Sequence, residues 1–553
     1  MTESKLLNTL AFCGAIAIAG AACSKGSTPS GPVCALPQVA CGQVCIDVTG
    51  DPDNCGGCGI PCTETQSCQG GVCVDQVGDG GGADGGGALD GGSADGAAIL
   101  PTLVTSAPGA YWQTGGLTSV TSGKADVTVD DSAVAQVWEG FGGSFNEMGW
   151  SYLSLLKPAD RDLALHLLYG DDGARFVFGR IPIGASDYAM ERYTDDEVPS
   201  GSSDPDMASF SIARDELMLI PFVKAVQAIK ADLRFWASPW TPPTWMKAAP
   251  FSAENPTSPF DGGSMKGDDA TLTAYAQYLI KFVQAYAQQG IKIEAISAQN
   301  EPSYTGTYPT CAWTPAIYDK FIGQYLGPAL SQAVAQSQLP ATKIILGTFN
   351  GGSSDHPIVN SVMGDATARG FVDLFAFQWG MLDYVGNVKA YHLPIWQSEH
   401  QCGNDPWVTP FDATAAPNDQ AYAVVSWGLI RDWIKAGVTA YSAWNMVLDT
   451  VGLSLDTTRP WPQNALLTVD TTTNTLSITP TYYVFRHLSQ FVVTGAKVVG
   501  TSGGDAVAFK NPDGSIVLVL YNAGAAKTLT VAVAARKLQL AMPGNGWATV
   551  VAR

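Results

Sequence analysis

The stretch IEAISAQNEPSYTG, residues 293–306, decides the fold because a short apolar run ends in Asn300, Glu301 and Pro302. Seven other β-branched or aromatic runs have the same form, and helical-looking stretches such as residues 158–169 and 271–290 alternate with them. This alternation is typical of βα units around a parallel sheet. The eight candidate strands lie near residues 135, 174, 233, 293, 343, 374, 393 and 440. They predict an α/β fold with a (β/α)8 TIM barrel over residues 137–455.

The segments on both sides of this barrel have a different pattern. After about Asp456 the chain shows short alternating strands, with Asp513-Gly514 as a hairpin turn dipeptide. We expect an antiparallel β-sandwich domain over residues 456–553. Residues 102–136 are expected to contribute its N-terminal strands.

The first residues are typical of an export signal. A weakly positive start at Lys5 precedes an apolar run that is too short to span a bilayer, which predicts a signal peptide over residues 1–22. Small residues stand directly before Cys23, as in a bacterial lipoprotein cleavage site. We expect Cys23 to carry a lipid anchor in the bacterial cell envelope, with simple cleavage and secretion as the alternative.

Residues 23–73 contain a dense group of eight cysteines, between Cys34 and Cys73. An even cluster behind a signal predicts a small disulfide-rich N-terminal module, whereas zinc is less well supported because the cluster contains no histidine. The run CIDVTGDPDNCGGCGIPC is similar to the stigma-specific-protein-like cysteine repeat of exported proteins. Residues 74–101 are rich in Gly and Asp, which predicts a flexible linker.

Charge and motifs exclude several classes of function. The chain carries 50 acidic and 30 basic residues, a formal charge of −20, which argues against binding of nucleic acid and against a polybasic membrane patch. Contact with a membrane is therefore expected only through Cys23. The sequence has no HExxH or P-loop motif, and we expect no metal and no cofactor. The expected partner of the chain, taken as a monomer, is a carbohydrate or glycolipid substrate.

Two glutamates end candidate strands and are candidates for a catalytic pair. Glu301 ends the fourth strand, and Glu399, in IWQSEHQCGN, ends the seventh. Active sites of TIM barrels lie at the carboxyl ends of the strands, so both side chains can meet at one mouth. A single strand-end glutamate is more often a solvated or ion-paired loop residue. A facing pair flanked by aromatic residues, however, indicates glycoside hydrolysis.

The residues around this pair resemble those of glycoside hydrolase family 30, the family of lysosomal glucosylceramidase and microbial β-glycosidases. The similarity covers residues 102–553 and depends on six motifs in family order: EGFGGSFNEMG, GRIPIGASDYA, FWASPWTPPTWMK, SAQNEPS, WQSEH and SAWNMVL. It implies a (β/α)8 barrel with a β-sandwich and a retaining mechanism. Glu301 would then be the acid/base and Glu399 the nucleophile, with carboxyl groups roughly 5 Å apart.

Five further residues have expected roles, which for Asp187, Trp240 and Trp444 are implied by the resemblance. Asn300 would donate a hydrogen bond to the sugar 2-hydroxyl, although an Asn that only accepts a loop amide is the alternative. Asp187 would accept hydroxyls on the far side of the sugar. Trp240 and Trp444 would form aromatic walls, with burial in the core as the alternative. Arg180 would orient Glu399 through charge-assisted hydrogen bonds.

The chain departs from the glucosylceramidase pattern after its fifth and sixth strands. Thr348, Phe349 and Asn350 follow the fifth strand, and Gln378, Trp379 and Gly380 follow the sixth. We expect these residues to remodel the pocket beside Glu399, with Trp379 contacting substrate. A β-1,6-linked glucan or galactan is therefore at least as plausible a substrate as glucosylceramide.

Two questions stay open at the level of sequence. Cys311 and Cys402 each follow a catalytic glutamate, and we expect a disulfide between them, with two free thiols as the alternative. The function also has two rivals, a catalytically inactive carbohydrate-binding surface protein and an endo-acting β-1,6-glycanase in place of an exo-acting glycosidase.

Overall fold

The computed structural model describes residues 38–41, 44–47, 51–53, 66–69, 72–75 and 102–553, within two compact units, Met1–Asp95 and Gly96–Arg553. In the first unit β1 (Gln38–Cys41) pairs antiparallel with β2 (Val44–Asp47), and β3 (Gln66–Gln69) pairs with β4 (Val72–Asp75). The signal peptide, the anchor at Cys23, the pairing of the eight cysteines and most of the linker lie outside what is described.

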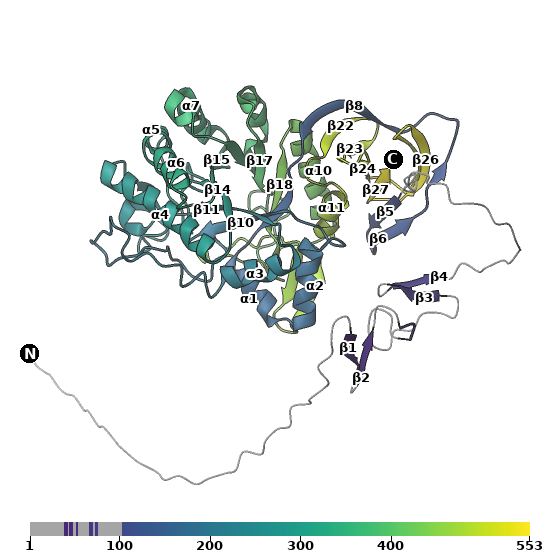
Figure 1. Cartoon of the computed structure of the whole chain (residues 1–553), viewed down its shortest axis with the longest axis horizontal. Coiled ribbons are helices and arrows are strands. Elements are labelled where there is room, and N and C mark those ends of the chain that lie inside the picture. The colour runs from purple at the N-terminus through teal and green to yellow at the C-terminus, as the bar shows by residue number, and fades with distance from the viewer. Residues whose placement is uncertain (1–37, 42–43, 48–50, 54–65, 70–71, 76–101) are drawn as a thin grey trace, which may run out of the picture. The chain divides into compact units, whose positions relative to one another are not determined.

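The second unit contains a closed parallel barrel of eight strands, which confirms the predicted TIM barrel (Figure 1). The strands follow one another around the barrel in chain order, and β18 closes against β9. They are β9 (Gly140–Ser144), β10 (Phe178–Ile183), β11 (Arg234–Pro239), β14 (Ile293–Ser297), β15 (Lys343–Phe349), β16 (Leu374–Gln378), β17 (Ile395–Glu399) and β18 (Ala440–Asn445).

Helices surround this barrel, and their ends follow local sequence signals. In α4 (Asp269–Gln288), the side chain of Asp268 caps the first turn, and Leu272, Tyr275 and Leu279 face the core. The other helices are α1 (Glu147–Leu155), α2 (Pro158–Tyr169), α3 (Leu219–Ile229), α5 (Pro315–Lys320), α6 (Gly327–Ala335), α7 (His356–Gly364), α8 (Ala366–Arg369), α9 (Val385–Val388), α10 (Gln420–Ala436) and α11 (Pro480–Ser489). Among the described residues, none of the helices has the length and apolar character that a membrane span needs.

The β-sandwich consists of a ten-stranded sheet with the order β6-β5-β27-β24-β23-β22-β8-β25-β26-β7. Segments from before the barrel pair with strands from after it, and Figure 1 shows the blue strand β8 among the yellow ones. The strands are β5 (Thr102–Ala107), β6 (Ala110–Gly115), β7 (Thr118–Ser119), β8 (Val127–Val137), β22 (Lys497–Ser502), β23 (Asp505–Lys510), β24 (Ile516–Asn522), β25 (Lys527–Val533), β26 (Arg536–Met542) and β27 (Gly546–Ala552). Asp513-Gly514 forms the expected turn between β23 and β24.

Two boundaries differ from the prediction. The sheet resumes at Lys497 and not near Asp456, because residues 456–492 include α11, whose Phe485 and Leu488 pack in the same core as the barrel. The stretch near residue 135 divides into the end of β8 and the start of β9. Trp138 lies at this division, fully buried against Phe141 and Phe509.

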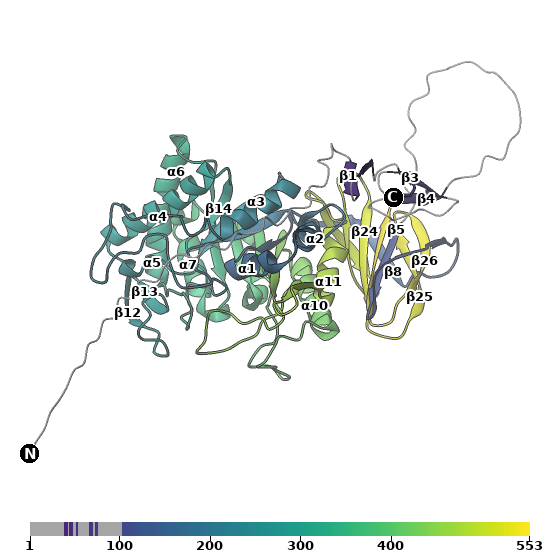
Figure 2. The same cartoon turned by 90° about the horizontal axis from the view of Figure 1, so that it is seen from below.

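A buried histidine joins the last barrel helix to the sandwich. Figure 2 shows α10 and α11 between the barrel and the sandwich strands. His487 of α11 contacts Thr549 of β27 through Nδ1 (2.8 Å) and Ser106 of β5 through Nε2 (2.9 Å). Thr549 donates its own proton to the carbonyl of His487, so Nδ1 carries the imidazole proton and Nε2 accepts from Ser106. Burial lowers the pKa of His487 to about 3, and the ring is neutral at neutral pH.

This burial predicts acid sensitivity of the fold. A histidine with a folded-state pKa of about 3 and an unfolded-state pKa of about 6.5 stabilises the fold above pH 6.5. As the pH falls from 6.5 toward 3, this contribution is lost by about 1.4 kcal/mol per pH unit. We expect His487→Gln, which keeps a donor and an acceptor but does not titrate, to lose less stability between pH 7 and pH 5 than the native chain in denaturant titrations. Equal losses in both proteins would contradict this assignment.

Candidate active site

A pocket of about 370 Å³ lies at the carboxyl ends of the barrel strands. The structure brings five of the predicted site residues together in its lining: Asp187, Glu301, Trp379, Glu399 and Trp444. Each stands at or after the end of a different strand, as the barrel geometry requires. Residues far apart in the chain therefore face one small space.

Glu301 follows β14 in a left-handed backbone conformation with φ 49°. This conformation is uncommon for a residue other than glycine, and its N–H is held by the carbonyl of Thr348 at 2.9 Å. The side chain accepts from the Tyr308 hydroxyl at Oε2 (2.9 Å) and from the Asn350 amide at Oε1. Both partners are neutral. Burial, and then the charge of Glu399, raises the pKa of Glu301 to about 8.

Glu399, the last residue of β17, has a cationic partner. Its Oε2 accepts from Nη1 of Arg180 at 2.5 Å and from Nε2 of Gln378 at 3.0 Å. Burial raises the pKa of Glu399, and the Arg180 charge and hydrogen bond oppose that rise. Because Arg180 contacts Glu399 and not Glu301, a single proton shared by the two carboxyls is better placed on Glu301.

Arg180 is itself fully buried within a box of aromatic rings. Its guanidinium carbon lies 4.4 Å from the ring centre of Trp240, 5.0 Å from that of Trp236 and 5.4 Å from that of Trp444. Trp240 also stacks on Trp444, with ring centres 5.3 Å apart. The prediction that Trp240 forms a wall of the pocket is wrong: Trp240 is 2% exposed and supports Trp444 and Arg180 from behind.

Asn300 lies beside this box with a fixed amide orientation. Its Oδ1 accepts from Arg180 (2.6 Å), Thr348 (2.7 Å) and Gln378 (2.8 Å). Since three donors converge on the oxygen, the amide nitrogen is left to donate elsewhere. Asn300 is 2% exposed and does not itself line the pocket, so its hydrogen bond to a sugar hydroxyl stays a prediction.

Asp187 faces the pocket with an unpaired oxygen. Its Oδ1 is buried and has no hydrogen-bond partner among the residues that the structure describes. Burial, and then the charge of Glu399, raises the pKa of Asp187 to about 8. An unpaired buried carboxyl costs free energy unless a ligand supplies hydrogen bonds, which suits recognition of sugar hydroxyls.

The predicted disulfide between Cys311 and Cys402 is wrong, because both are free and buried. Cys402 lines the pocket next to Trp444. The chain around Cys311 instead returns to β13 (Gly262–Met265): the N–H of Ala312 bonds to the Gly263 carbonyl, which draws Cys311 into the core. Burial raises the pKa of the Cys311 thiol to about 12.

Sequence reasoning placed one neighbour wrongly and missed several others. Asn350 was expected beside Glu399 but contacts Glu301, because β15 is the neighbour of β14 in the barrel. Tyr308, Trp407 and Trp461 also line the pocket. They stand on long loops after β14, β17 and β18, whose path the strand pattern does not indicate. Tyr308 follows Glu301 by seven residues, the one signal that could have found it.

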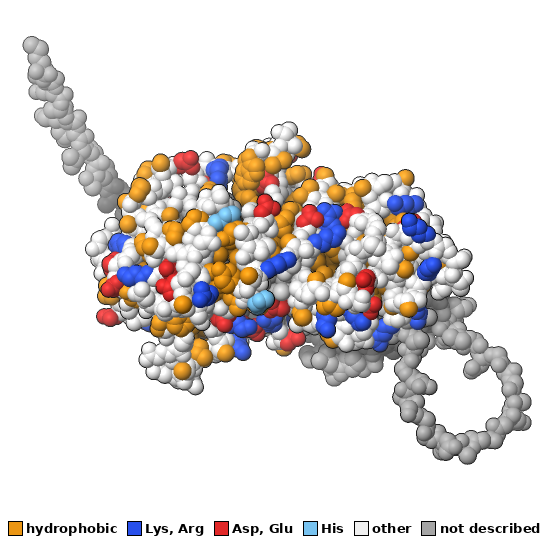
Figure 3. All heavy atoms as spheres, turned by 90° about the horizontal axis from the view of Figure 1, so that it is seen from above, with side chains coloured by type: hydrophobic (Ala, Val, Ile, Leu, Met, Phe, Trp, Pro, Cys, Tyr) orange, Lys and Arg blue, Asp and Glu red, His pale blue; other side chains and the backbone are white. Residues whose placement is uncertain are grey.

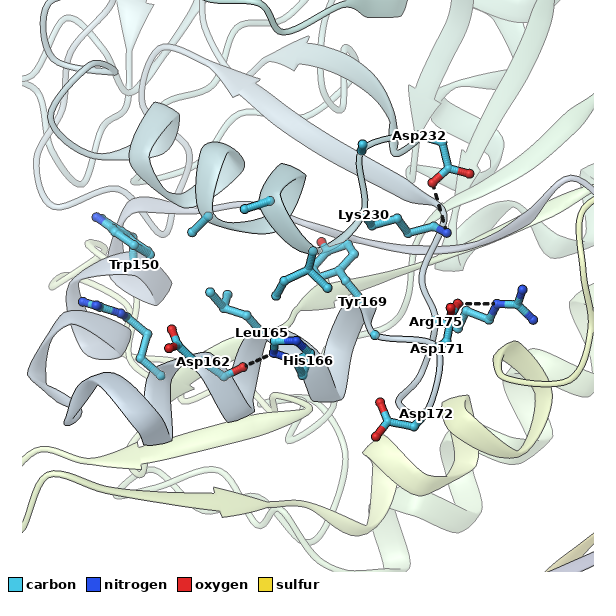
Figure 4. Close-up of a pocket in the computed structure, with 16 residues that line it drawn as sticks. Trp150, Asp162, Leu165, His166, Tyr169, Asp171, Asp172, Arg175, Lys230 and Asp232 are labelled. Carbon is cyan, nitrogen blue, oxygen red and sulfur yellow. Dashed lines mark hydrogen bonds and ion pairs between the residues drawn. The ribbon is translucent and has the colours of Figure 1, made fainter. Parts of the chain in front are cut away.

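A larger hollow, of about 1060 Å³, lies between α2 and α3 at the ends that precede β10 and β11 (Figure 4). Four of its charged residues form two ion pairs, Arg175 with Asp171 and Lys230 with Asp232. This end of a barrel serves stability and not catalysis. Figure 3 views the molecule from above Figure 1, and acidic and basic side chains are interspersed on the face seen there.

Comparison with known proteins agrees with this geometry. The family model described as glycosyl hydrolase family 30 TIM-barrel domain matches residues 138–492, and that family's beta sandwich domain matches residues 495–550. Putative glucosylceramidase 4 of Caenorhabditis elegans is 27% identical over 444 residues, 75% of this chain and 80% of the relative. Endo-1,6-beta-D-glucanase BGN16.3 of Trichoderma harzianum is 28% identical over 415 residues, 72% and 80% of the two chains. The crystal structure of SrfJ from Salmonella typhimurium superposes with a TM-score of 0.70 at 21% identity, over 82% of this chain and 100% of that one.

The ion pair inside the aromatic box predicts a strong coupling between Arg180 and Glu399. Arg180→Met leaves a buried carboxylate without its cation and should cost about 3–5 kcal/mol of unfolding free energy at pH 7. Adding Glu399→Gln removes the unpaired charge, so the double variant should be more stable than Arg180→Met alone. Denaturant titration of the native chain, Arg180→Met, Glu399→Gln and the double variant measures this coupling.

A matched control is Arg234→Met, which breaks the less buried pairs with Glu294 and Glu139 and should cost less than Arg180→Met. The Arg180→Met deficit should also shrink on acidification, because Glu399 then folds as the neutral acid. A double variant no more stable than Arg180→Met would overturn the account of the pair.

Proposed function

The chain belongs to glycosyl hydrolase family 30, and on that premise we propose that it is a retaining β-glycosidase with Glu399 as nucleophile and Glu301 as acid/base. The observation that carries this proposal is the unequal surroundings of two buried carboxyls in one pocket. Glu399 is paired with Arg180, whereas Glu301 meets the neutral Tyr308 and Asn350. One carboxyl is thus held as the anion and the other as the acid.

In the proposed first step, a Glu399 oxygen attacks the anomeric carbon while Glu301 gives its proton to the leaving oxygen. Asn300 donates to the sugar 2-hydroxyl as positive charge develops on the ring. In the second step Glu301 takes a proton from water, which displaces Glu399 with overall retention. The Tyr308 hydroxyl can donate to the Glu301 carboxylate and accept from the Glu301 acid, so it fits both states.

The proposed substrates are β-linked glucosides or galactosides, either in a β-1,6-linked glycan or on a glycolipid. Relatives named as glucosylceramidases and as endo-1,6-β-glucanases support both classes. The unpaired Asp187 supports a glycone with free hydroxyls. Export, and a lipid anchor on Cys23, stay proposals that depend on the sequence of residues 1–23.

Substitution of each carboxyl tests the two roles separately. We expect Glu399→Gln to lose activity on every substrate, because neither step can begin without the nucleophile. Glu301→Gln should keep the first step on an aryl glycoside with a good leaving group and stall in the second, so that a small anionic nucleophile such as azide restores turnover. Product analysis by mass spectrometry and NMR follows hydrolysis and anomeric configuration.

A product with inverted anomeric configuration would contradict the double-displacement mechanism. Absence of hydrolysis across β-glucosides, β-galactosides, β-1,6-glucan, β-1,6-galactan and glucosylceramide, with the protein folded, would favour the rival carbohydrate-binding function. The folded state is checked by the denaturation midpoint of each protein.

The pH dependence of activity follows from the pKa of Glu301. Glu301 must be protonated for the first step, so kcat/KM should fall as the pH rises through about 8. It should also fall at low pH, where Glu399 becomes protonated. In Glu301→Gln, kcat/KM for the activated aryl glycoside should lose the alkaline limb, since no acid is then required. If the alkaline fall in kcat/KM persists in Glu301→Gln, it reports the titration of another group such as Asp187.

A further inference from the structure

We propose that Trp407, held by Trp379 and Trp461, is the platform on which the leaving group of the substrate stacks, and that this leaving group is a sugar ring. The inference rests on the proposed function, because Glu301 defines where the leaving oxygen lies. It concerns the loops after β16, β17 and β18, which form part of the pocket rim.

One side of the pocket mouth is closed by contacts between loops. The Leu455 N–H donates to the carbonyl of Asp187 at 2.9 Å, which joins the loop after β18 to the loop after β10. The Arg459 guanidinium donates to the Tyr304 hydroxyl at 3.0 Å, and Thr307 donates to Asp456, which join the loops after β18 and β14. The loop after β18 also bonds to the loop after β17, through the Trp461 indole N–H and the Gly403 carbonyl (3.2 Å). The rim over β15 and β16, beside Trp379 and Trp407, is therefore the side on which we expect a substrate to extend.

The position of the acid also places the leaving group on this side. Glu301 is held by Asn350, the first residue after β15, whereas the glycone carboxyl Asp187 belongs to the loop after β10. A proton delivered from Glu301 reaches an oxygen that points away from Asp187. The next residues around the rim from Asn350 are Trp379 and Trp407.

The three indoles form an ordered aromatic group. Trp379 and Trp407 stack with ring centres 6.2 Å apart and planes at 21°, and Trp461 meets Trp407 edge-on at 5.0 Å and 71°. Trp407 is nevertheless 58% exposed. The Trp407 ring is thus held in place by its neighbours, and its exposed part is free to contact a ligand.

The polar groups around this platform favour a sugar over an acyl chain. Asn350 and Arg459 line the same pocket, and the Arg459 guanidinium carbon lies 5.9 Å from the ring centre of Trp461. Sugar hydroxyls can pair with these donors while the C–H face of the ring covers the indole. An acyl chain would offer no acceptor to the N–H groups that Asn350 and Arg459 have left after donating to Glu301 and Tyr304.

Two substrates distinguish binding to the Trp407 platform from the chemical step. Both have the same glycone and an alcohol as the leaving group, and only one of them leaves as a sugar ring. Methyl β-glucoside has no leaving ring, whereas the β-1,6-linked glucose disaccharide leaves as a sugar through a primary alcohol. If the glycone proves to be galactose, the two galactose analogues replace them. In the full chain, Trp407→Ala should lower kcat/KM for the disaccharide about tenfold and change that for the methyl glycoside less than twofold. Trp407→Phe, which keeps a ring, should restore most of the loss.

Tyr391→Ala is the matched control, because Tyr391 is an exposed aromatic that precedes β17 at the opposite end of the barrel. Equal losses on both substrates would show that Trp407 shapes the glycone pocket, and no loss on either would remove the platform; each result overturns the inference. If Trp407→Ala lost activity only on glucosylceramide in detergent micelles, the rim would bind the lipid part of the substrate. That result would also overturn the inference. Failure of the native chain on all substrates would instead be a failure of the proposed function.

Discussion

The site depends on one buried ion pair, Arg180 with Glu399, inside a box of tryptophan rings. Burying two charges is costly unless each is paired and hydrogen-bonded. Ser238, Asn300 and Thr348 therefore converge on the remaining guanidinium donors. These residues come from β11, the end of β14 and β15, so the pair fixes several strand ends at once. Trp240 and Trp444 exclude water from the pair while their ring faces stabilise the cation.

The same pair creates the difference between the two glutamates. Both carboxyls are buried, and burial alone would raise the pKa of each. A single guanidinium on one side breaks this symmetry, and the anion it holds on Glu399 then raises the pKa of Glu301 further. On the proposed mechanism, the chain thus obtains an acid and a nucleophile from identical side chains through their neighbours.

The sequence predicts the barrel well because each strand is a short apolar run that ends in polar residues, and strand ends share one mouth. Glu301, Glu399 and Asp187 could be placed by this rule, since it fixes which end of a strand a residue occupies. It does not fix on which side of the strand end the side chain lies. Trp240 therefore turned out to lie behind the pocket, and Asn350 beside the other glutamate. Cys311 was misplaced because its loop returns to a β-hairpin whose pairing no local pattern shows.

The long loops make the two sides of the pocket mouth different. Their path is the part of the structure that the sequence predicts least well. A barrel mouth is symmetric in principle, with eight equivalent strand ends. Contacts between the loops after β10, β14 and β18 join one side of the mouth, and we propose that a substrate extends on the other side. Glu301 lies between the closed side and the open one, and Asn350 holds it toward the open side. On the proposed mechanism, the direction in which the leaving group departs depends on these contacts between loops and on the hydrogen bond that Asn350 donates to Glu301. A family with constant carboxylates can change substrate by changing these loops alone.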